Sequence, residues 1–301
     1  MQPSQTARPA LFFGQRPADN PLDLNQLVAP VIALLRDVAA TELMPRFKHV
    51  IAERKHDGTV VTAADRAVEA VLARVLPTLF DCPVLGEEMP PDVQQRLWRD
   101  ADWLWCVDPL DGTGNFTNGK RYFGISVALM HRIEDRRESV FGAIFDPNLN
   151  EVFYALRGRG ALMIDNQGAA KRLMPQPPKP LADALIEVGR FKLLGRIKTA
   201  LSQNPPAKKM VSSGASVLQW SHMACGRVDA FIHAGEQPWD YAAGALILEE
   251  AGGKMATIMH DDYWRSVDAE GTRDGLWQKS AIAARHPALF DEWKRWVRSH
   301  H

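Results

Sequence analysis

One stretch constrains this chain more than any other part of it. Residues 108–116 read Asp-Pro-Leu-Asp-Gly-Thr-Gly-Asn-Phe and directly follow an apolar run at residues 103–107. Apolar residues followed by Asp-Pro predict a buried strand that ends at Pro109, because proline cannot donate the next ladder hydrogen bond. The Asp-Gly-Thr-Gly segment then predicts a tight turn in which glycines let backbone amides approach an anion such as phosphate. The sequence therefore places Asp108 and Asp111 at the end of a strand, beside a site suited to phosphate.

Two aspartates this close in the chain imply a cation between them. At a separation of about 4 Å and an effective dielectric of about 20, two carboxylates repel by roughly 4 kcal/mol. Protonation or a bound metal must offset that repulsion. Hard divalent ions with oxygen ligands, above all Mg²⁺, suit such a cluster and share it with a substrate phosphate. The alternative is a strand-to-turn connection capped by aspartate, which is common for Asp-Gly alone and accounts less well for the whole stretch.

Composition excludes several other classes of protein. The 301 residues carry no net charge, and no dense run of Lys and Arg appears, so we expect neither a nucleic-acid partner nor an anionic membrane surface. No apolar run has membrane-spanning length. The three cysteines, Cys82, Cys106 and Cys225, lie far apart and are expected to be small core residues in a reducing compartment. These features predict a cytoplasmic protein, and they do not exclude a small phosphorylated partner.

The chain is expected to divide at a proline-rich linker over residues 175–180. Residues 1–22 form a loose N-terminal extension. Residues 23–174 contain an amphipathic helix that ends near Pro45, a helix that is capped by Thr62 or Asp65, and a mostly antiparallel meander. Residues 89–102 are interpreted as a surface connection, and residues 131–138 as a charged turn. Residues 181–301 alternate strands and helices, which predicts an α+β first part and a smaller α/β half.

Three further acids have an ordinary and a functional interpretation. Asp65 near a helix start is by itself a typical cap or first-turn acid, and Asp240 is an ordinary helix N-cap. Glu87 and Glu88 form a pair that is usually solvated, although Glu87 follows a short strand just before the Asp108 strand. If that short strand pairs beside the Asp108 strand, Glu87 joins the same carboxylate cluster.

Together these residues resemble the inositol monophosphatase family, which belongs to a larger group of metal-dependent, lithium-sensitive phosphatases that includes fructose bisphosphatase. The resemblance covers residues 27–295 and rests on Gly-Glu-Glu at 86–88, the stretch 108–116, and Trp239-Asp240 with Glu-Ala-Gly-Gly at 250–253. It implies a layered αβαβα sugar-phosphatase fold, inhibition by Li⁺ and a homodimer.

The resemblance also implies a set of metal ligands. Two or three Mg²⁺ ions would be bound by Glu87, Asp108, the carbonyl of Leu110, Asp111 and Asp240. This set agrees with the carboxylate cluster expected from the residues themselves.

The catalytic and phosphate-binding residues follow from the same match. Asp65 and Thr113 would orient or deprotonate a metal-bound water, with Glu87 as the alternative base. The backbone amides of Gly112 and Thr113 would hold the phosphate, and Asp240 would also face the substrate. Such a site needs no covalent phosphoenzyme.

Two departures from the family pattern concern the turn and the substrate. Gly114 follows Thr113 where many members have a longer residue. His233 lies seven residues before Asp240, where inositol-selective members place a glutamate that contacts sugar hydroxyls; Glu236 is the alternative residue for that contact.

The sequence therefore predicts a Mg²⁺-dependent phosphomonoesterase for inositol 1-phosphate or a related polyol phosphate. Histidinol-phosphate phosphatase and 3′(2′),5′-bisphosphate nucleotidase are the alternatives within the class. Two alternatives lie outside the phosphatase class. One is a catalytically inactive regulatory homologue, and the other is a two-metal nuclease, which the neutral charge disfavours.

Overall fold

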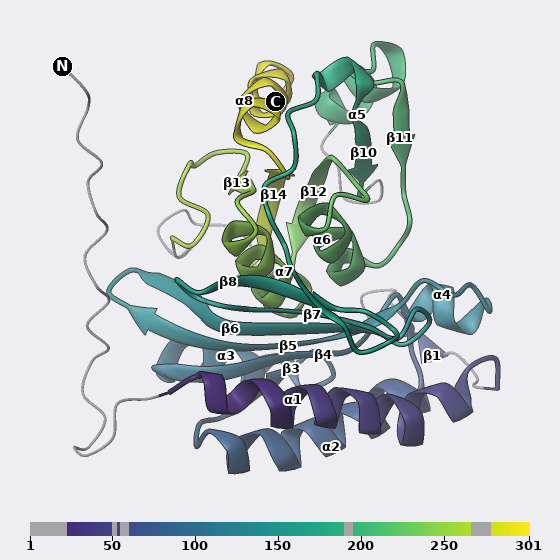
Figure 1. Cartoon of the computed structure of the whole chain (residues 1–301), viewed down its shortest axis with the longest axis vertical. Helices are drawn as coiled ribbons and strands as arrows, with labels where there is room; N and C mark the ends of the chain where they lie inside the picture. Colours follow the sequence, from purple (N-terminus) through teal and green to yellow (C-terminus); the bar gives the residue numbers. More distant parts are fainter. Residues whose placement is uncertain (1–22, 50–52, 55–59, 190–194, 266–277) are drawn as a thin grey trace.

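The computed structural model describes residues 23–49, 53–54, 60–189, 195–265 and 278–301. Over these ranges the chain forms five layers (Figure 1). Helices α1 and α2 cover the outer face of a seven-stranded sheet, and α6 and α7 lie between that sheet and a five-stranded sheet. Helices α5 and α8 cover the far face of the second sheet. This order confirms the expected αβαβα fold.

The larger sheet is a meander with one parallel pair at its edge. Its strands run in the order β3-β4-β5-β6-β7-β8-β9, and every neighbouring pair is antiparallel except β3 with β4. Their bounds are Val84–Gly86 (β3), Trp103–Asp111 (β4), Gly124–Ile133 (β5), Arg136–Asp146 (β6), Glu151–Leu156 (β7), Gly160–Ile164 (β8) and Ala170–Arg172 (β9).

The smaller sheet is mixed. Its order is β11-β10-β12-β14-β13, with β10 parallel to both β11 and β12 and the remaining pairs antiparallel. The bounds are Leu185–Val188 (β10), Lys209–Val211 (β11), Ala230–Glu236 (β12), Lys254–Ala256 (β13) and Lys279–Ala284 (β14). A separate antiparallel pair joins β1 (Glu53–Arg54) to β2 (Val60–Val61).

The three helical layers consist of α1 with α2, α6 with α7, and α5 with α8, and the described helices also include α3 and α4. Their bounds are Asn25–Val38 (α1), Ala63–Leu79 (α2), Pro91–Asp100 (α3), Thr113–Thr117 (α4), Gly195–Gln203 (α5), Ser216–Ala224 (α6), Pro238–Glu250 (α7) and Pro287–Ser299 (α8). Shorter helical segments are η1 (Ala39–Leu43, π), η2 (Met44–Arg46, 3₁₀) and η3 (Leu181–Asp183, 3₁₀). In the described ranges, no helix combines the length and apolar character that crossing a membrane requires.

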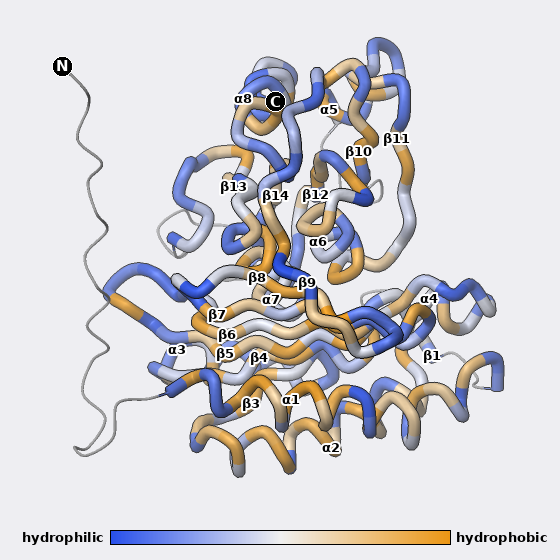
Figure 2. The backbone as a smooth tube through the Cα atoms, viewed as in Figure 1, coloured by the Kyte–Doolittle hydropathy of each residue, from blue (hydrophilic) through white to orange (hydrophobic). Residues whose placement is uncertain are grey.

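Side-chain alternation decides which layer each strand residue faces. Along β4, Trp105 and Val107 pack in the core beneath α1 and α2, whereas Leu104 and Cys106 pack in the core shared with α6 and α7. Asp108 follows Leu104 and Cys106 in this alternation, and its side chain therefore lies on the face of the sheet that packs against α7. Figure 2 shows the same pattern along the chain, with apolar segments concentrated in the strands and in α1 and α2 and the connecting loops mostly hydrophilic.

The predicted end of the β4 strand at Pro109 is wrong. Pairing with β5 continues to Asp111, and the register shifts between the Asp108–Ser126 pair and the Asp111–Gly124 pair. Pro109 lies inside this irregularity, where the ladder does not require an amide donor. This bulge bends the strand. The carboxylates of Asp108 and Asp111 consequently lie close together, just before the chain enters α4.

Two other expectations are also corrected. Residues 89–102 are not only a surface connection, because they contain α3, whose buried Trp98 packs against the sheet. Residues 131–138 are mostly strand, since β5 runs to Ile133 and β6 begins at Arg136. Charged residues at the end of a long hairpin remain compatible with strand when only one face is buried.

The remaining expectations of the fold hold where they are described. The first helix, the meander, the linker before β10 and the terminal helix with Trp293 and Trp296 appear as expected, and Thr62 is the cap of α2. The extension at residues 1–22 and the turn at Asp57 lie outside the described residues. The proposed division into residues 23–174 and 181–301 stays a prediction.

Candidate active site

Asp108 is the most buried member of the carboxylate cluster. Its side chain is 1% exposed, and its Oδ1 accepts a hydrogen bond of 3.0 Å from the Leu110 amide. Its other oxygen, Oδ2, is buried and has no hydrogen-bond partner among the described residues. Burial raises the pKa of Asp108 well above its usual range, and the nearby charges of Glu87, Asp111 and Asp240 raise it further. An acid with a buried, unpartnered oxygen is suited to bind a cation.

Asp111 connects the larger sheet to helix α6. Its Oδ2 accepts a hydrogen bond of 2.7 Å from the Val217 amide, which lies in the first turn of α6. Burial, followed by repulsion from Asp240, raises the pKa of Asp111 to about 8. The helix amide stabilises the charged form, but it does not outweigh these two effects.

Asp240 comes from α7 and completes the cluster. It is the third residue of that helix, and its Oδ2 accepts a hydrogen bond of 2.8 Å from the amide of Gln237, the N-cap residue. Asp240 is thus part of a capping box rather than the N-cap expected from the sequence. Ligand oxygens of Asp108, Asp111 and Asp240 all lie within 4.8 Å of one another.

The three carboxylates fit a hard divalent cation. Their oxygens converge, burial and neighbouring carboxylates raise the pKa values of Asp108 and Asp111, and one buried oxygen of Asp108 lacks a partner among the described residues. Oxygen-only donors favour Mg²⁺, Mn²⁺ or Ca²⁺ over zinc, which prefers nitrogen and sulfur.

Helix α7 reaches this cluster because it packs closely on the larger sheet. Gly142 of β6 has no side chain where α7 crosses, and a Cβ added there would lie 2.9 Å from the Ala243 Cα and 3.0 Å from its carbonyl oxygen. Ser139, also on β6, donates a hydrogen bond of 2.7 Å to the carbonyl of Ala242. The small residues after Asp240 therefore place the first half of α7 directly against β6, two strands from β4 in the sheet.

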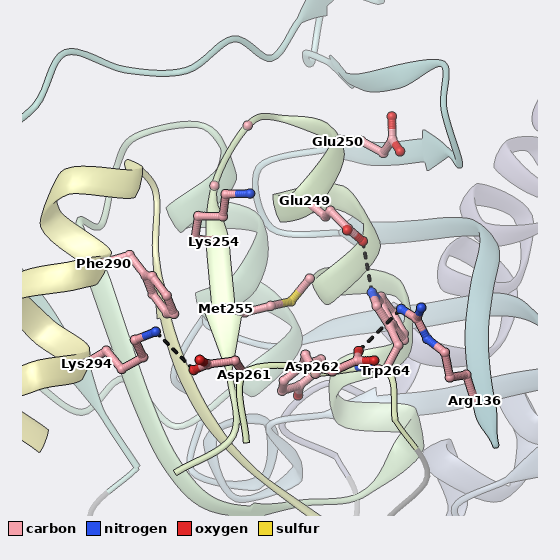
Figure 3. Close-up of a pocket in the computed structure, with 13 residues that line it drawn as sticks. Arg136, Glu249, Glu250, Lys254, Met255, Asp261, Asp262, Trp264, Phe290 and Lys294 are labelled. Carbon is pink, nitrogen blue, oxygen red and sulfur yellow. Dashed lines mark hydrogen bonds and ion pairs between the residues drawn. The ribbon is translucent and has the colours of Figure 1, made fainter. Parts of the chain in front are cut away.

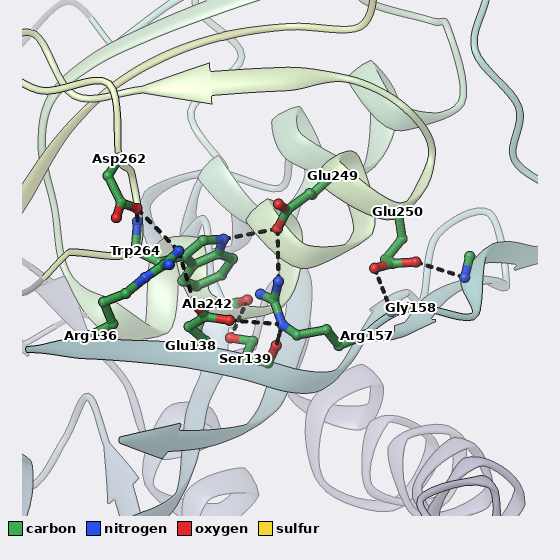
Figure 4. A network of polar contacts seen from close by, with 11 residues as sticks. Arg136, Glu138, Ser139, Arg157, Gly158, Ala242, Glu249, Glu250, Asp262 and Trp264 are labelled. Atoms are coloured by element: carbon green, nitrogen blue, oxygen red, sulfur yellow. Dashed lines mark hydrogen bonds and ion pairs between the residues drawn. The ribbon is translucent and has the colours of Figure 1, made fainter. Parts of the chain in front are cut away.

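The far end of α7 is held by polar contacts to the same sheet (Figure 4). Glu250 accepts hydrogen bonds of 2.7 Å from the amides of both Gly158 and Gly160. Glu249 pairs with Arg157 at 3.2 Å. The helix is thus attached to β6 near its start and to the turn between β7 and β8 at its end, which limits how far Asp240 can move from Asp108.

Asp65 and Thr113 lie within hydrogen-bonding distance of each other, and their joint role on a metal-bound water stays a prediction. Asp65 is fully buried in the first turn of α2, where its Oδ2 accepts from the amide of Thr62 at 2.8 Å and from its hydroxyl at 2.6 Å. Its Oδ1 lies 3.1 Å from the Thr113 hydroxyl, which also has the Leu110 carbonyl within 3.0 Å. One hydroxyl proton thus has two acceptors within reach. Burial raises the pKa of Asp65 despite these hydrogen bonds.

Gly112 has a conformation that favours glycine. Its φ is +88°, and a Cβ there would lie 2.9 Å from the carbonyl oxygen of Tyr122 and 3.0 Å from the Cβ of Ala215. Gly112 precedes α4, which begins at Thr113 and has only one short turn of helix. The chain therefore turns sharply directly after Asp111.

Glu87 follows the edge strand β3, which pairs in parallel with β4. After burial, its charge is the largest cause of the raised pKa of Asp108, ahead of the charges of Asp111 and Asp240. The charge of Glu87 therefore acts on Asp108, but Glu87 is not among the three acids whose ligand oxygens converge, and its place in the metal site stays a prediction.

His233 lies on β12, outside the carboxylate cluster. Its Nδ1 accepts a hydrogen bond of 3.2 Å from the Gly235 amide, and its ring stacks on Phe231 with centroids 6.1 Å apart. The ring also fills the space beside Gly189 where a side chain would stand. A contact between His233 and a substrate stays a prediction.

Glu236 is a buried acid whose position the sequence did not reveal. It is fully buried, and its Oε1 accepts hydrogen bonds from the Ser216 hydroxyl and, at 3.0 Å, from the Trp220 indole. Its Oε2 is buried without a partner among the described residues. Burial and then repulsion from Asp240 raise the pKa of Glu236 to about 8. A bulge between His233 and Glu236 turns its side chain toward α6, and no local sequence pattern signals such a bulge.

A separate cavity of about 620 Å³ lies beside the C-terminal end of α7 (Figure 3). Carboxylates that line it have partners: Glu249 accepts from the Trp264 indole at 2.9 Å, and Asp261 pairs with Lys294 at 3.0 Å. This cavity is distinct from the cluster around Asp108, which lies at the other end of the helix.

The fold and the carboxylate cluster together define a layered α+β protein with a candidate site for divalent cations where β4 meets the start of α7. A profile of the inositol monophosphatase family matches residues 23–293. The chain belongs to that family.

Relatives and solved structures agree with this assignment. The chain is 31% identical over 241 residues to Nus factor SuhB of Xylella fastidiosa, covering 78% of this chain and 80% of that protein. It is 30% identical over 213 residues to the inositol-1-monophosphatase of Bacillus subtilis, covering 69% and 76%. Among solved structures, an IMPase of Thermotoga maritima superposes with a TM-score of 0.72 at 25% identity, covering 91% of this chain and 97% of that one.

Proposed function

We propose that this protein is a Mg²⁺-dependent phosphomonoesterase that hydrolyses a small phosphorylated metabolite, with inositol 1-phosphate or a related polyol phosphate as substrate. The observation that carries the proposal is the convergence of three carboxylates within 4.8 Å, one of them with a buried, unpartnered oxygen. Family membership supports a phosphatase that needs metal, and the inositol-1-monophosphatase of Bacillus subtilis supports the substrate class.

The proposed metal ligands are the residues expected from the sequence. Glu87, Asp108, the carbonyl of Leu110, Asp111 and Asp240 would bind two or three Mg²⁺ ions. When bound, these ions lower the pKa of water, neutralise phosphate oxygens and stabilise the leaving alkoxide. The protein contributes a rigid and largely buried frame for the ligands, since Asp111 is held by the α6 amide and Asp240 by its capping box.

The proposed base system consists of Asp65 and Thr113. A buried carboxylate 3.1 Å from the Thr113 hydroxyl can accept its proton, which leaves the threonine oxygen free to accept a proton from the attacking water. The raised pKa of Asp65 brings its basicity nearer to neutral pH. Glu87 is the alternative base, because it also lies near the cluster.

The proposed phosphate site is the turn after Asp111. The amides of Gly112 and Thr113 would donate to phosphate oxygens, and the left-handed conformation of Gly112 turns the chain toward the cluster. Asp240 and His233 would face the rest of the substrate.

The test is phosphate release from purified protein with inositol 1-phosphate, histidinol phosphate, fructose 1,6-bisphosphate and adenosine 3′,5′-bisphosphate, each with Mg²⁺ and with EDTA. We expect turnover of inositol 1-phosphate that EDTA abolishes and added Mg²⁺ restores. A preference for histidinol phosphate or the bisphosphate would select the corresponding alternative substrate. Absence of Mg²⁺-dependent turnover across the panel would refute the proposal and favour a regulatory homologue.

Further properties implied by the resemblance are predictions with their own measurements. Millimolar Li⁺ should inhibit turnover at limiting Mg²⁺, and light scattering should give a homodimer at micromolar concentration. A cytoplasmic location and the lack of a nucleic-acid partner also stay predictions. Several relatives carry the name Nus factor SuhB. A filter-binding assay with labelled RNA and DNA therefore tests the predicted lack of a nucleic-acid partner.

A further inference from the structure

The turn that carries Glu87 has little support from its own strand. Strand β3 contains only Val84–Gly86, lies at the edge of the sheet and pairs with β4 alone among the described strands. Glu87 is the first residue beyond it. The position of the Glu87 carboxylate therefore depends on what holds the backbone of the turn between β3 and α3.

Gln94 of α3 holds one side of this turn. Its side chain is 5% exposed, and its amide nitrogen Nε2 donates to the carbonyl of Gly86 at 2.8 Å and to the carbonyl of Glu87 at 3.1 Å. Both hydrogens of the side-chain amide are thus directed at the two peptide units that flank Glu87. A buried side-chain amide with two adjacent backbone acceptors determines the orientation of that backbone closely.

Glu69 of α2 holds the other side. Its side chain is 9% exposed, and its Oε2 accepts a hydrogen bond of 2.9 Å from the Glu88 amide. A Cβ at Gly86 would clash with the Glu69 carboxylate, so the glycine is what lets this acid reach the turn. Glu69 lies one helical turn after Asp65, and the same face of α2 therefore reaches both the proposed base and the turn that carries Glu87.

We propose that Gln94 and Glu69 are positioning residues that hold Glu87 in the geometry for binding Mg²⁺. The inference rests on the proposed metal site, in which Glu87 is a ligand. Mg²⁺ requires nearly ideal octahedral geometry, so a displaced carboxylate is a weaker ligand even when its charge is unchanged. Partners that orient metal ligands typically change metal affinity by about 10- to 100-fold when they are lost.

The first experiment changes Gln94 and uses its neighbour as a matched control. Gln94→Glu keeps the shape but directs carboxylate oxygens at two carbonyl oxygens, and Gln94→Ala removes the donor. Gln95→Ala removes the same side chain from an exposed position one residue later on α3. Mg²⁺ binding is measured by isothermal titration calorimetry without substrate, and unfolding by circular dichroism shows which variants are folded.

We expect both Gln94 variants to raise the Kd for Mg²⁺ by about 10-fold, whereas Gln95→Ala stays within about twofold of wild type. Turnover at saturating Mg²⁺ should recover in large part, and KM for the phosphorylated substrate should change little. A folded Gln94→Ala or Gln94→Glu protein with wild-type Mg²⁺ affinity would overturn the proposal for Gln94. So would an equal loss of affinity in Gln95→Ala.

The second experiment separates position from charge at Glu69. In Glu69→Gln the side-chain carbonyl can still accept from the Glu88 amide, whereas Glu69→Ala removes the acceptor. We expect the glutamine variant to keep the Kd for Mg²⁺ within about threefold of wild type and the alanine variant to raise it by about 10-fold. Hydrogen exchange of the Glu88 amide should accelerate only in the alanine variant. Equal losses of affinity in both variants would show that the charge of Glu69 acts on the ion, and would overturn its positioning role.

The outcomes of these two positioning experiments can be distinguished from the outcome that would refute the proposed phosphatase activity. Wild-type protein that binds Mg²⁺ but releases no phosphate from any substrate refutes the phosphatase and leaves the positioning test intact, because that test measures metal binding alone. Wild-type protein that binds no Mg²⁺ refutes both.

Discussion

Replacing Asp111 with asparagine should stabilise the metal-free protein at alkaline pH while it removes activity. The folded state holds Asp111 near Asp240, and its pKa is raised to about 8 by burial and by that neighbour. The unfolded chain has an ordinary aspartate pKa of about 4. Between these values the folded state binds more protons than the unfolded state, so the contribution of Asp111 to stability falls as the pH rises from about 4 to about 8.

The magnitude follows from the geometry of the cluster. Two carboxylate charges no more than 4.8 Å apart repel by about 3 kcal/mol or more at an effective dielectric of about 20. Asparagine removes this repulsion, and its side-chain carbonyl can still accept the hydrogen bond from the Val217 amide. The uncharged acceptor forms a weaker hydrogen bond, which costs about 1 kcal/mol. We therefore expect the variant to be about 1–3 kcal/mol more stable than wild type at pH 8.5 in EDTA, and about equally stable at pH 5.

The assay is urea unfolding of wild type and Asp111→Asn in EDTA at pH 5 and pH 8.5. Asp81→Asn is the control at an exposed position, and its free energy of unfolding relative to wild type should be the same at both pH values. Saturating Mg²⁺ should reverse the order at pH 8.5, because it stabilises the wild type more than the variant. At the same time kcat should fall by at least about 100-fold. A variant that is destabilised equally at both pH values would refute the raised pKa of Asp111, and near-normal turnover would refute its role as a metal ligand.

Three further predictions concern other parts of the site. Gly142→Ala should push α7 away from the sheet through Ala243, cost about 1–3 kcal/mol in urea unfolding and weaken Mg²⁺ binding in calorimetry; unchanged Mg²⁺ affinity would contradict this. Thr113→Val should lower kcat by about 100-fold and Thr113→Ser far less, if the hydroxyl passes a proton to Asp65; similar rates for both variants would exclude the relay. His233→Glu should raise kcat/KM for inositol 1-phosphate relative to histidinol phosphate, because a carboxylate accepts two hydroxyl hydrogen bonds; an unchanged ratio would remove His233 from the specificity pocket.

Much of the architecture follows from local patterns. The apolar residues of β4 to β7, the helical spacing of α1 and α2 and the proline-rich linker are each encoded in consecutive residues, and each appears in the structure. Element boundaries followed less closely from the sequence. A bulge allows Pro109 to lie within β4, and α3 is a mostly polar segment that begins after two prolines, although Val93, Leu97 and Trp98 recur at helical spacing.

The sequence by itself determined that Asp108 and Asp111 stand at the end of a strand, before a tight turn that contains Gly112. Period-two alternation also assigns Asp108 to the same face as Leu104 and Cys106. These properties depend only on neighbours along the chain.

Only the tertiary structure decided which distant residues complete the site. Asp240 reaches Asp108 because Gly142 and the small residues of α7 permit a close crossing, and Gln94 and Glu69 reach the turn at Glu87 from two different helices. Such contacts depend on how whole faces of helices and sheets fit together, and side chains at these crossings carry no local periodic signal. The raised pKa values have the same origin, since burial and like charge arise only when these separate segments meet.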